Sequence, residues 1–185
     1  MSTESPGSSI SRMIAQSREV LTQRNVATFD KYEKDGTLRD AIIYIALAAA
    51  LSGLVGLFQG PMGFLSGILT TVFGFLVFVY LVHWLGSQRG GTGTLDEVAY
   101  SFALFWAPVS VLTSAVTLVL VLTIIGIFLI PLLVIAALVI NVWFAYMATQ
   151  ASLNLEPGGK TWSVLLLAAV GSAVVNLLVG ALLAI

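Results

Sequence analysis

The sequence has no cysteine, a single histidine and few charged residues. Only 9% of its 185 residues are charged and 58% are hydrophobic, whereas globular domains carry roughly 25% charged residues. The absence of cysteine excludes a disulfide, a thiolate zinc site and a cysteine nucleophile. Because the net charge is -1, the chain has no general basic field, which argues against a nucleic-acid partner. The composition therefore disfavours a soluble globular protein.

Charge is scarcest after residue 40. The charged residues beyond that point are Arg89, Asp96, Glu97, Glu156 and Lys160. Between them lie apolar runs of 18 residues or more, and about 20 helical residues cross a hydrocarbon core of ~30 Å. The sequence therefore predicts an all-α membrane protein, a bundle of five transmembrane helices. The predicted spans are 41–58, 64–85, 98–122, 127–151 and 162–185.

The run from 98 to 151 is almost continuously apolar, and it would extend ~80 Å as a single helix. No bilayer is that thick, so the chain must reverse within the run. Gly126 and Pro131 mark the most favourable place for a turn, because proline is tolerated in the first turn of a helix and disrupts its interior. We therefore expect two spans here, joined by a short turn.

The positively charged residues indicate the orientation of these spans. The positive-inside rule places Lys and Arg that flank short loops on the cytoplasmic side. With a cytoplasmic N-terminus, five spans put all eight Lys and Arg residues on that side. Arg89, Asp96 and Glu97 then belong to the cytoplasmic loop between spans two and three, and Lys160 to the loop between spans four and five. The C-terminus is expected on the extracytoplasmic side.

The first 40 residues are polar and lack the apolar core of a signal peptide near the start. We expect residues 1–40 to form a cytoplasmic tail and residues 41–185 to form the transmembrane domain. In the tail, the residues that gather toward one side of a helix are Ile10, Met13, Ile14, Val20 and Leu21, with Arg12 and Arg18 on or near the other side. This pattern favours a short amphipathic helix on the membrane surface. A solvated, partly disordered tail is the alternative.

Two glycine-rich segments, RGGTGT and GGKT, partly resemble phosphate-binding loops. A P-loop follows a strand and requires glycine five residues before the glycine that precedes its lysine, where this chain has Asn154. We interpret both segments as turns between membrane helices. Thr94 and Glu97 have the spacing of a capping box that starts the third span, and Thr37 with Asp40 repeats the spacing before the first.

The sequence predicts no catalytic, cofactor-binding or metal-binding residues. His83 is the only histidine, and a lone imidazole without nearby carboxylates cannot build a multi-ligand metal site. Next to Trp84, it fits an anchor at the membrane interface. The five spans contain no Asp, Glu, Lys or Arg, the residues that ion-driven pumps place there. We therefore expect neither an enzyme nor a bound cofactor.

Three carboxamide side chains fall within the spans. Asn141 and Gln150 belong to the fourth span and Asn176 to the fifth. If both helices are straight, the depths of Asn141 and Asn176 differ by only ~8 Å. They could form hydrogen bonds between helices, each contributing about 0.6 to 2 kcal/mol. Contact with a polar substrate is the other interpretation.

The fifth span carries small or polar residues at every fourth position. They are Ala168, Ser172, Asn176, Gly180 and Ala184. In lipid, a face of small side chains lets helix backbones approach closely, so we expect this face to pack within the bundle or against a partner. Pro108 lies inside the third span, where it should kink the helix, and is the candidate hinge.

The order of these features resembles the Yip-domain membrane proteins, named for their interaction with Ypt/Rab GTPases. The resemblance runs through LVHWLGSQRGGTGTLDEVAYSFALFWAP and continues into VINVWFAYMATQASLNLEPGGKTWSV. It implies five spans, a cytoplasmic N-terminus and no catalysis. Eukaryotic members act in vesicle trafficking with prenylated small GTPases. The tail of this chain is only about 40 residues, which argues against a Rab-type partner and favours a bacterial member in the cytoplasmic (inner) membrane.

Two functions follow from these features. The first is a non-enzymatic membrane scaffold or adaptor, or an accessory subunit of a membrane complex. Its partners would be membrane lipids and other integral membrane proteins or further copies of itself. The second is a small lipid or solute transporter, with a path lined by Asn141, Ser172 and Asn176 and gated at Pro108. An enzyme ranks behind both, because no cluster of residues supports one.

Overall fold

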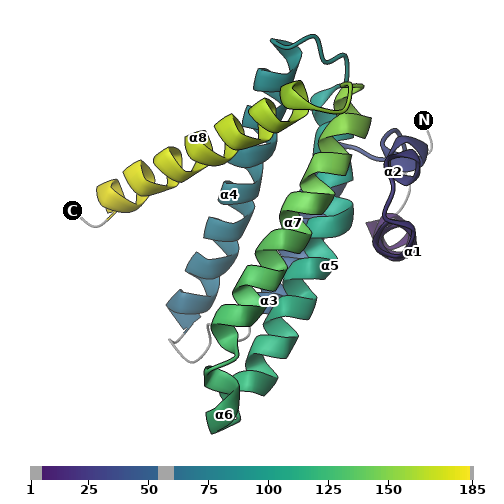
Figure 1. The fold of residues 1–185 in the computed structure, drawn as a ribbon. Coiled ribbons are helices and arrows are strands. Elements are labelled where there is room, and N and C mark those ends of the chain that lie inside the picture. The colour runs from purple at the N-terminus through teal and green to yellow at the C-terminus, as the bar shows by residue number, and fades with distance from the viewer. Residues whose placement is uncertain (1–5, 54–60, 184–185) are drawn as a thin grey trace.

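The computed structural model describes residues 6–53 and 61–183, which form helices and no strand. The helices are α1 (Pro6–Gln23), α2 (Val26–Tyr32), α3 (Leu38–Ser52), α4 (Pro61–Ser87), α5 (Leu95–Val121), α6 (Ile124–Ile127), α7 (Ile130–Leu153) and α8 (Gly159–Leu183). Figure 1 shows α5 and α7 running side by side, with α8 inclined away from them and α1 and α2 against the flank of the bundle. The described residues thus have the expected all-α architecture.

Four helices are long and apolar enough to cross a membrane: Phe64–Ser87, Leu95–Val121, Ile130–Leu153 and Gly159–Val179. They correspond to the second to fifth predicted spans. The predicted first span, 41–58, begins in α3, whose 15 residues extend about 22 Å. Its residues 54–58 lie outside the described part of the chain. Because the hydrocarbon core is ~30 Å thick, the described helices support four spans, and the predicted count of five is not supported.

The long apolar run reverses close to the expected residues. α5 ends at Val121, the single turn of α6 follows, and α7 begins at Ile130 with Pro131 in its first turn. Gly126 lies so close to the end of α5 that a Cβ atom there would come 2.2 Å from the carbonyl oxygen of Leu120. Glycine therefore permits the tight reversal, and proline begins the returning helix.

Both predicted capping boxes are confirmed. The Thr94 backbone N–H donates to Glu97 Oε2 at 2.8 Å, and the Glu97 N–H donates to Thr94 Oγ1 at 3.2 Å. Thr37 and Asp40 form the same reciprocal pair at the start of α3. Each box satisfies backbone donors that a helix N-terminus otherwise leaves without a partner.

The core is centred on α5, which packs most extensively against α3 and α7. Its residues from Val98 to Phe105 are all buried. Phe105 stacks on Phe144 of α7, with ring centroids 5.7 Å apart, and meets Phe29 of α2 edge-on at 6.3 Å. Each such aromatic pair contributes about 0.5–1.5 kcal/mol beyond its burial. This aromatic cluster joins an N-terminal helix to two membrane helices.

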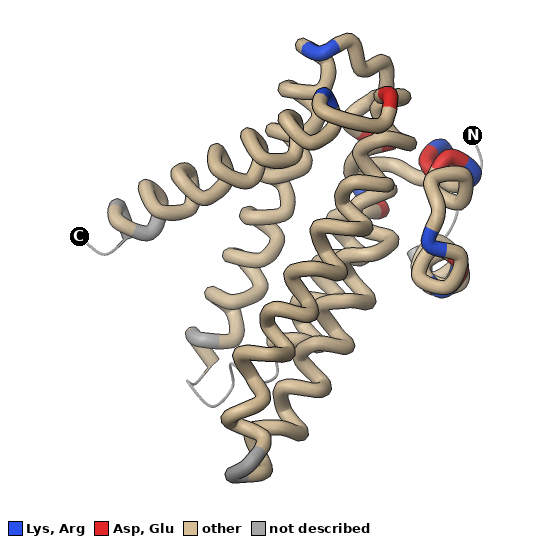
Figure 2. Tube along the Cα trace, in the orientation of Figure 1, with Lys and Arg blue, Asp and Glu red and all other residues tan. Residues whose placement is uncertain are grey.

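The charged residues are confined to one end of the molecule. Figure 2 shows them at the upper end of the bundle and on the two N-terminal helices, while the lower part of the described chain carries none. Arg89 lies between α4 and α5, Asp96 and Glu97 begin α5, and Lys160 begins α8. The two loops that the sequence assigned to one side of the membrane therefore lie at the same end.

The glycine-rich loop between α4 and α5 is packed against the end of α7. A Cβ atom on Gly93 would lie 1.5 Å from the carbonyl oxygen of Ser152. Beside it, the Thr92 N–H donates to the carbonyl oxygen of Leu153 at 3.0 Å, and Asn154 Nδ2 donates to Thr92 Oγ1 at 3.1 Å. The loop is therefore a turn that docks on a neighbouring helix, and this packing accounts for glycine at position 93.

We expect Gly93→Ala to destabilise the bundle. The new methyl group would overlap backbone that cannot rotate away, and overpacking of this kind costs about 1–3 kcal/mol or more. Thermal unfolding of purified protein in detergent should show a lower midpoint. Gly159→Ala is the matched control, since no atom lies within 4 Å of the position that its methyl group would take. Equal midpoints for the two variants would contradict the packing role of Gly93.

Candidate functional site

A polar cavity lies between α3, α4, α5 and α8. Its volume is ≈ 430 Å³. The lining residues are Ala49, Ser52, Thr70, Thr71, Gly74, Trp106, Ser110, Ser114, Ser172 and Asn176. Gly74, Ser110 and Ser172 stand near the middle of α4, α5 and α8. The cavity is therefore at a depth where polar side chains are costly and often functional.

Two hydroxyl groups that line this cavity are hydrogen-bonded within their own helices. Thr71 Oγ1 donates to the carbonyl oxygen of Gly67 at 2.9 Å, and Ser110 Oγ donates to that of Ala107 at 2.8 Å. Their hydroxyl protons are used within their own helices, which leaves oxygen lone pairs available. Ser52 Oγ is buried and has no hydrogen-bond partner among the described residues. The lining offers hydroxyl and amide groups and no charged side chain, which suits a small, uncharged, polar molecule.

Asn141 and Asn176 do not share a path. Asn176 lines the polar cavity, whereas Asn141 lines a second cavity of ≈ 390 Å³ between α4, α5, α7 and α8. The second cavity is walled by aromatic and aliphatic side chains, and Trp106 of α5 borders both. The structure therefore does not bring the two asparagines into one cavity, because depth along a helix does not determine which way the residue faces; the predicted path through both stays a prediction.

Both asparagines donate to their own helices. Asn141 Nδ2 donates to the carbonyl oxygen of Ala137 at 2.8 Å, and Asn176 Nδ2 donates to that of Ser172 at 2.8 Å. Asn176 Nδ2 also lies 3.3 Å from Ser172 Oγ. Each amide thus satisfies a donor locally, as short polar side chains do in helices. The oxygen of Asn176 faces α4, 3.9 Å from the position that a Cβ atom on Gly74 would take.

Gln150 belongs to a polar network at the charged end of α7. Its Nε2 donates to Tyr146 Oη at 3.3 Å, and the same phenolic oxygen accepts the Gly158 N–H at 2.9 Å. The Tyr146 ring stacks on Trp162 of α8, with centroids 4.8 Å apart. The buried Gln150 therefore supports the turn between α7 and α8.

The small-residue face of α8 lies partly against α4. Ala168 is fully buried, and Gly171 approaches α4 so closely that a Cβ there would lie 3.1 Å from Leu81 Cδ1. Ser172 and Asn176 continue this face into the polar cavity. Gly180 falls in the last part of α8, and Ala184 lies outside the described residues.

Pro108 does not divide α5, which runs through it as one helix from Leu95 to Val121. Nearby, Ser110 lines the polar cavity one turn after Trp106. The hinge at Pro108 stays a prediction.

The sequence analysis did not single out the cavity residues Ser110 and Ser114. Hydroxyl side chains are common in membrane helices, because they bond to the preceding turn. A signal was nevertheless present, since Ser110 and Ser114 are four residues apart and so share one face of α5. Within the described residues, no three His, Cys, Asp or Glu side chains are grouped so that they could hold a metal ion.

The N-terminal segment is helical and docked on the bundle. Met13 and Val20 of α1 are buried. Tyr100 Oη of α5 donates to Gln16 Oε1 at 2.6 Å, and Ser17 Oγ lies 3.1 Å from Tyr44 Oη of α3. Figure 1 shows α1 end-on beside the upright α5 and α7, so its axis crosses theirs. The alternative of a disordered tail does not fit residues 6–23.

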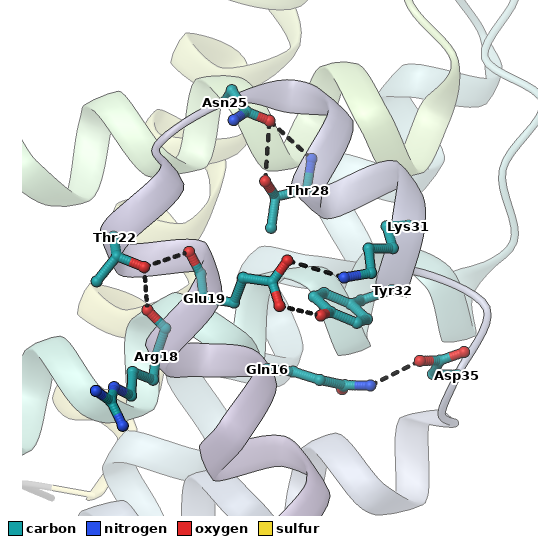
Figure 3. Close-up of polar contacts among 9 residues, drawn as sticks. All are labelled: Gln16, Arg18, Glu19, Thr22, Asn25, Thr28, Lys31, Tyr32 and Asp35. Atoms are coloured by element: carbon teal, nitrogen blue, oxygen red, sulfur yellow. Dashed lines mark hydrogen bonds and ion pairs between the residues drawn. The ribbon is translucent and has the colours of Figure 1, made fainter.

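Figure 3 shows how α1 and α2 are held together. Lys31 Nζ donates to Glu19 Oε1 at 2.8 Å, and Gln16 Nε2 donates to Asp35 Oδ2 at 2.6 Å. The hydrogen bond from Lys31 lowers the pKa of Glu19. Asn25 Oδ1 accepts the Thr28 N–H at 2.9 Å and so caps α2.

Glu33 is a buried carboxyl group directly after α2, with a relative exposure of 3%. One turn earlier, Phe29 meets Phe105 and Phe144, so this end of α2 faces α5 and α7. Glu33 Oε2 has no hydrogen-bond partner among the described residues, and Oε1 lies 3.6 Å from the exposed Lys34 Nζ. Burial, together with the negative charge of Glu97, raises the pKa of Glu33.

The family model of the Yip1 domain matches residues 18–178. The match covers most of the chain, including the docked N-terminal helices from Arg18 onward, and it confirms the resemblance seen in the sequence. No curated protein and no solved structure shows a significant match to the chain.

We expect Glu33→Gln to stabilise the protein at neutral pH. Folding raises the pKa of the Glu33 carboxyl group above its ordinary value of 4.5. The protonated carboxyl group therefore contributes its full share of stability below pH 4.5, and that contribution is lost as the pH rises through the pKa of the folded state. Glutamine stays neutral throughout. The midpoint of unfolding of the variant should therefore rise relative to that of the wild type as the pH is raised from acidic to neutral.

Glu156→Gln is the control for Glu33→Gln, because Glu156 is exposed in the α7–α8 loop. It should leave the pH dependence of the wild type unchanged. A Glu33→Gln profile that follows the wild type at every pH would show that Glu33 does not disfavour the docked state.

Proposed function

This chain belongs to the Yip1 domain family, and we propose that it is a non-enzymatic scaffold, adaptor or accessory subunit of a membrane complex. The observation that carries this proposal is the docked pair α1–α2. These helices hold a charged surface beside membrane helices whose few charged residues lie in their first turns at the same end. A surface fixed in this way can bind a partner without the loss of conformational entropy that ordering a flexible tail would require.

The proposed topology has five spans, a cytoplasmic N-terminus and an extracytoplasmic C-terminus, in a bacterial cytoplasmic membrane. It counts residues 41–58 as the first span. The gathering of Arg89 and Lys160 at the end that carries α1 and α2 supports it, because the positive-inside rule would place that whole end in the cytoplasm.

The outer side of the N-terminal helices supplies the partner surface. Arg18 and Lys34 are exposed there. Among the described residues, Arg18 forms no ion pair with a carboxylate, and Lys34 contacts only Glu33. Electrostatic complementarity to such residues governs specificity and association rate more than raw affinity. The partner expected here is a membrane protein with an acidic cytoplasmic segment, or a second copy of this chain.

We expect the double variant Arg18→Glu/Lys34→Glu to lose this partner. Inside-out membrane vesicles would be treated with a membrane-impermeant crosslinker, and the products recovered with the chain would be compared with those of the wild type. Reversing two charges turns attraction into repulsion, so a wild-type product should disappear. Lys160→Glu, which reverses an exposed charge at the start of α8, should retain it.

Absence of any product from the wild type would remove support for the scaffold. Labelling only in right-side-out vesicles would contradict the proposed orientation.

A second candidate function, transport of a small uncharged solute, is favoured by the polar cavity. The cavity lies near the middle of α4, α5 and α8, where transporters commonly bind their substrates. Its hydroxyl groups and the Asn176 oxygen match the hydrogen-bond donors of a polyol. Movement at Pro108, close to Ser110, would open the cavity.

Purified protein in liposomes should admit labelled glycerol faster than empty liposomes, and Asn176→Leu should abolish the difference. Leucine removes the amide that lines the polar cavity. Asn141→Leu is the matched control, because Asn141 lines the other cavity and its substitution should leave the flux unchanged. Flux that survives Asn176→Leu would exclude this path.

A further inference from the structure

The segment that joins α2 to α3 lies along the first turns of α5. At one end of this contact, Phe29 of α2 meets Phe105 edge-on, with ring centroids 6.3 Å apart. At the other end, the Leu38 N–H donates to Asp96 Oδ1 at 2.8 Å. The segment therefore runs in the direction opposite to α5, and the residues between these two contacts face the start of that helix.

Glu33 lies midway along the segment, and its carboxyl group faces α5. It is buried, and burial raises its pKa, as does the negative charge of Glu97, so the two carboxyl groups are close together. Ser101 lies four residues after Glu97 and four before Phe105, so these three residues follow one face of α5. Ser101 is therefore the residue of α5 that stands beside the Glu33 carboxyl group.

Two buried oxygen atoms at this junction lack a partner. Neither Glu33 Oε2 nor Ser101 Oγ has a hydrogen-bond partner among the described residues, and Ser101 is fully buried. Such atoms are rare in folded proteins, because each retains the full cost of its desolvation. Lys34 Nζ lies beside the other carboxylate oxygen, 3.6 Å from Oε1. The inner side of the junction therefore presents oxygen atoms from a carboxylate and a hydroxyl group, close to the charge of Glu97.

We propose that Glu33, Ser101 and Glu97 bind a magnesium ion that joins α2 to α5. Mg²⁺ takes oxygen ligands and is commonly held by one or two carboxylates while it keeps several waters. Two carboxylates and one hydroxyl group meet this requirement. The described residues offer no cluster of three His, Cys, Asp or Glu side chains, which a closed transition-metal site needs. The ion also removes the repulsion between the two carboxylates.

The position of the junction allows a hydrated ion to enter. Glu97 is partly exposed, and the start of α5 lies at the charged end of the molecule, away from the uncharged part of the spans (Figure 2). The site goes beyond both proposed functions, because it needs neither a partner protein nor a transported solute. An ordered water molecule is the alternative occupant, and it would leave both negative charges in place.

The test compares thermal unfolding of the purified full chain in detergent with EDTA and with MgCl₂. The midpoint of the wild type should rise by about 3–6 °C when Mg²⁺ is at ten times its dissociation constant. Glu33→Gln and Ser101→Ala should lose most of this rise. In EDTA, Glu33→Gln should be more stable than the wild type, because the buried carboxylate then has no cation to offset its charge, and Mg²⁺ should reduce or reverse that difference.

The controls separate binding from general effects. Thr149→Ala removes another buried hydroxyl group that lacks a described partner, about 140° around α7 from Phe144, which faces α2. It should keep the full response to Mg²⁺. KCl at equal ionic strength should not reproduce the rise, since it screens charges without binding between them. Mn²⁺, which shares the preference for oxygen ligands, should bind to the wild type and not to Glu33→Gln in electron paramagnetic resonance titrations.

Three results would overturn the proposal. The first is a wild type with equal midpoints in EDTA and MgCl₂, which would assign the place beside Ser101 to water. The second is an equal rise in KCl or in Glu33→Gln, which would show screening or binding elsewhere. The third is a wild type that binds no Mn²⁺, a result that does not depend on the folding of any variant. A larger rise with CaCl₂ than with MgCl₂ would overturn the identity of the ion.

Discussion

The cost of placing a charged group in hydrocarbon organises this molecule. Lys, Arg or Asp at the centre of a membrane helix costs about 2.5–3.5 kcal/mol by insertion measurements, a large fraction of the stability of most domains. The chain meets this constraint by keeping its charges on the N-terminal helices, in loops and in the first turns of the helices that begin at one end. The spans are left with hydroxyl and amide groups, which can bond to the backbone of their own helix. Every polar feature of the membrane region is therefore neutral.

The same constraint explains why the helices are joined by close packing and aromatic contacts. Without a hydrophobic driving force in lipid, association depends on dispersion and on backbones that approach closely. Gly93 at the end of α7 and Gly171 beside α4 permit such approaches, while Phe105 links α2, α5 and α7. Where larger side chains keep helices apart, cavities remain. Trp106 separates two of them, one lined by polar groups and the other by aromatic rings.

The N-terminal helices connect the charged end to the membrane region. Their buried contacts join polar partners, such as Gln16 with Tyr100, whereas Glu33 remains a buried carboxyl group with one oxygen lacking a partner. A buried group of that kind lowers the stability of the docked state at neutral pH. The other contacts thus hold α1 and α2 on the bundle, although the ionised Glu33 opposes this docking. Protonation of Glu33 strengthens the docking.

The sequence by itself determined the features that depend on neighbouring residues. Long apolar runs identified the four described spans, Thr94 with Glu97 identified a capping box, and the scarcity of charge identified the membrane. The count of five was not settled in this way, because α3 is shorter than a bilayer in its described part. The match to the Yip1 domain confirmed the resemblance that the order of these features had suggested.

Only the tertiary structure decided which side chains meet. Sequence gives the depth of Asn141 and Asn176 along their helices, but the direction in which each faces depends on how the helices pack, and the two face different cavities. In the same way, Gln16 and Tyr100 are 84 residues apart, and no local pattern predicts their hydrogen bond. Hydropathy and capping act over a few residues, whereas cavities and docked helices result from contacts between segments that only folding brings together.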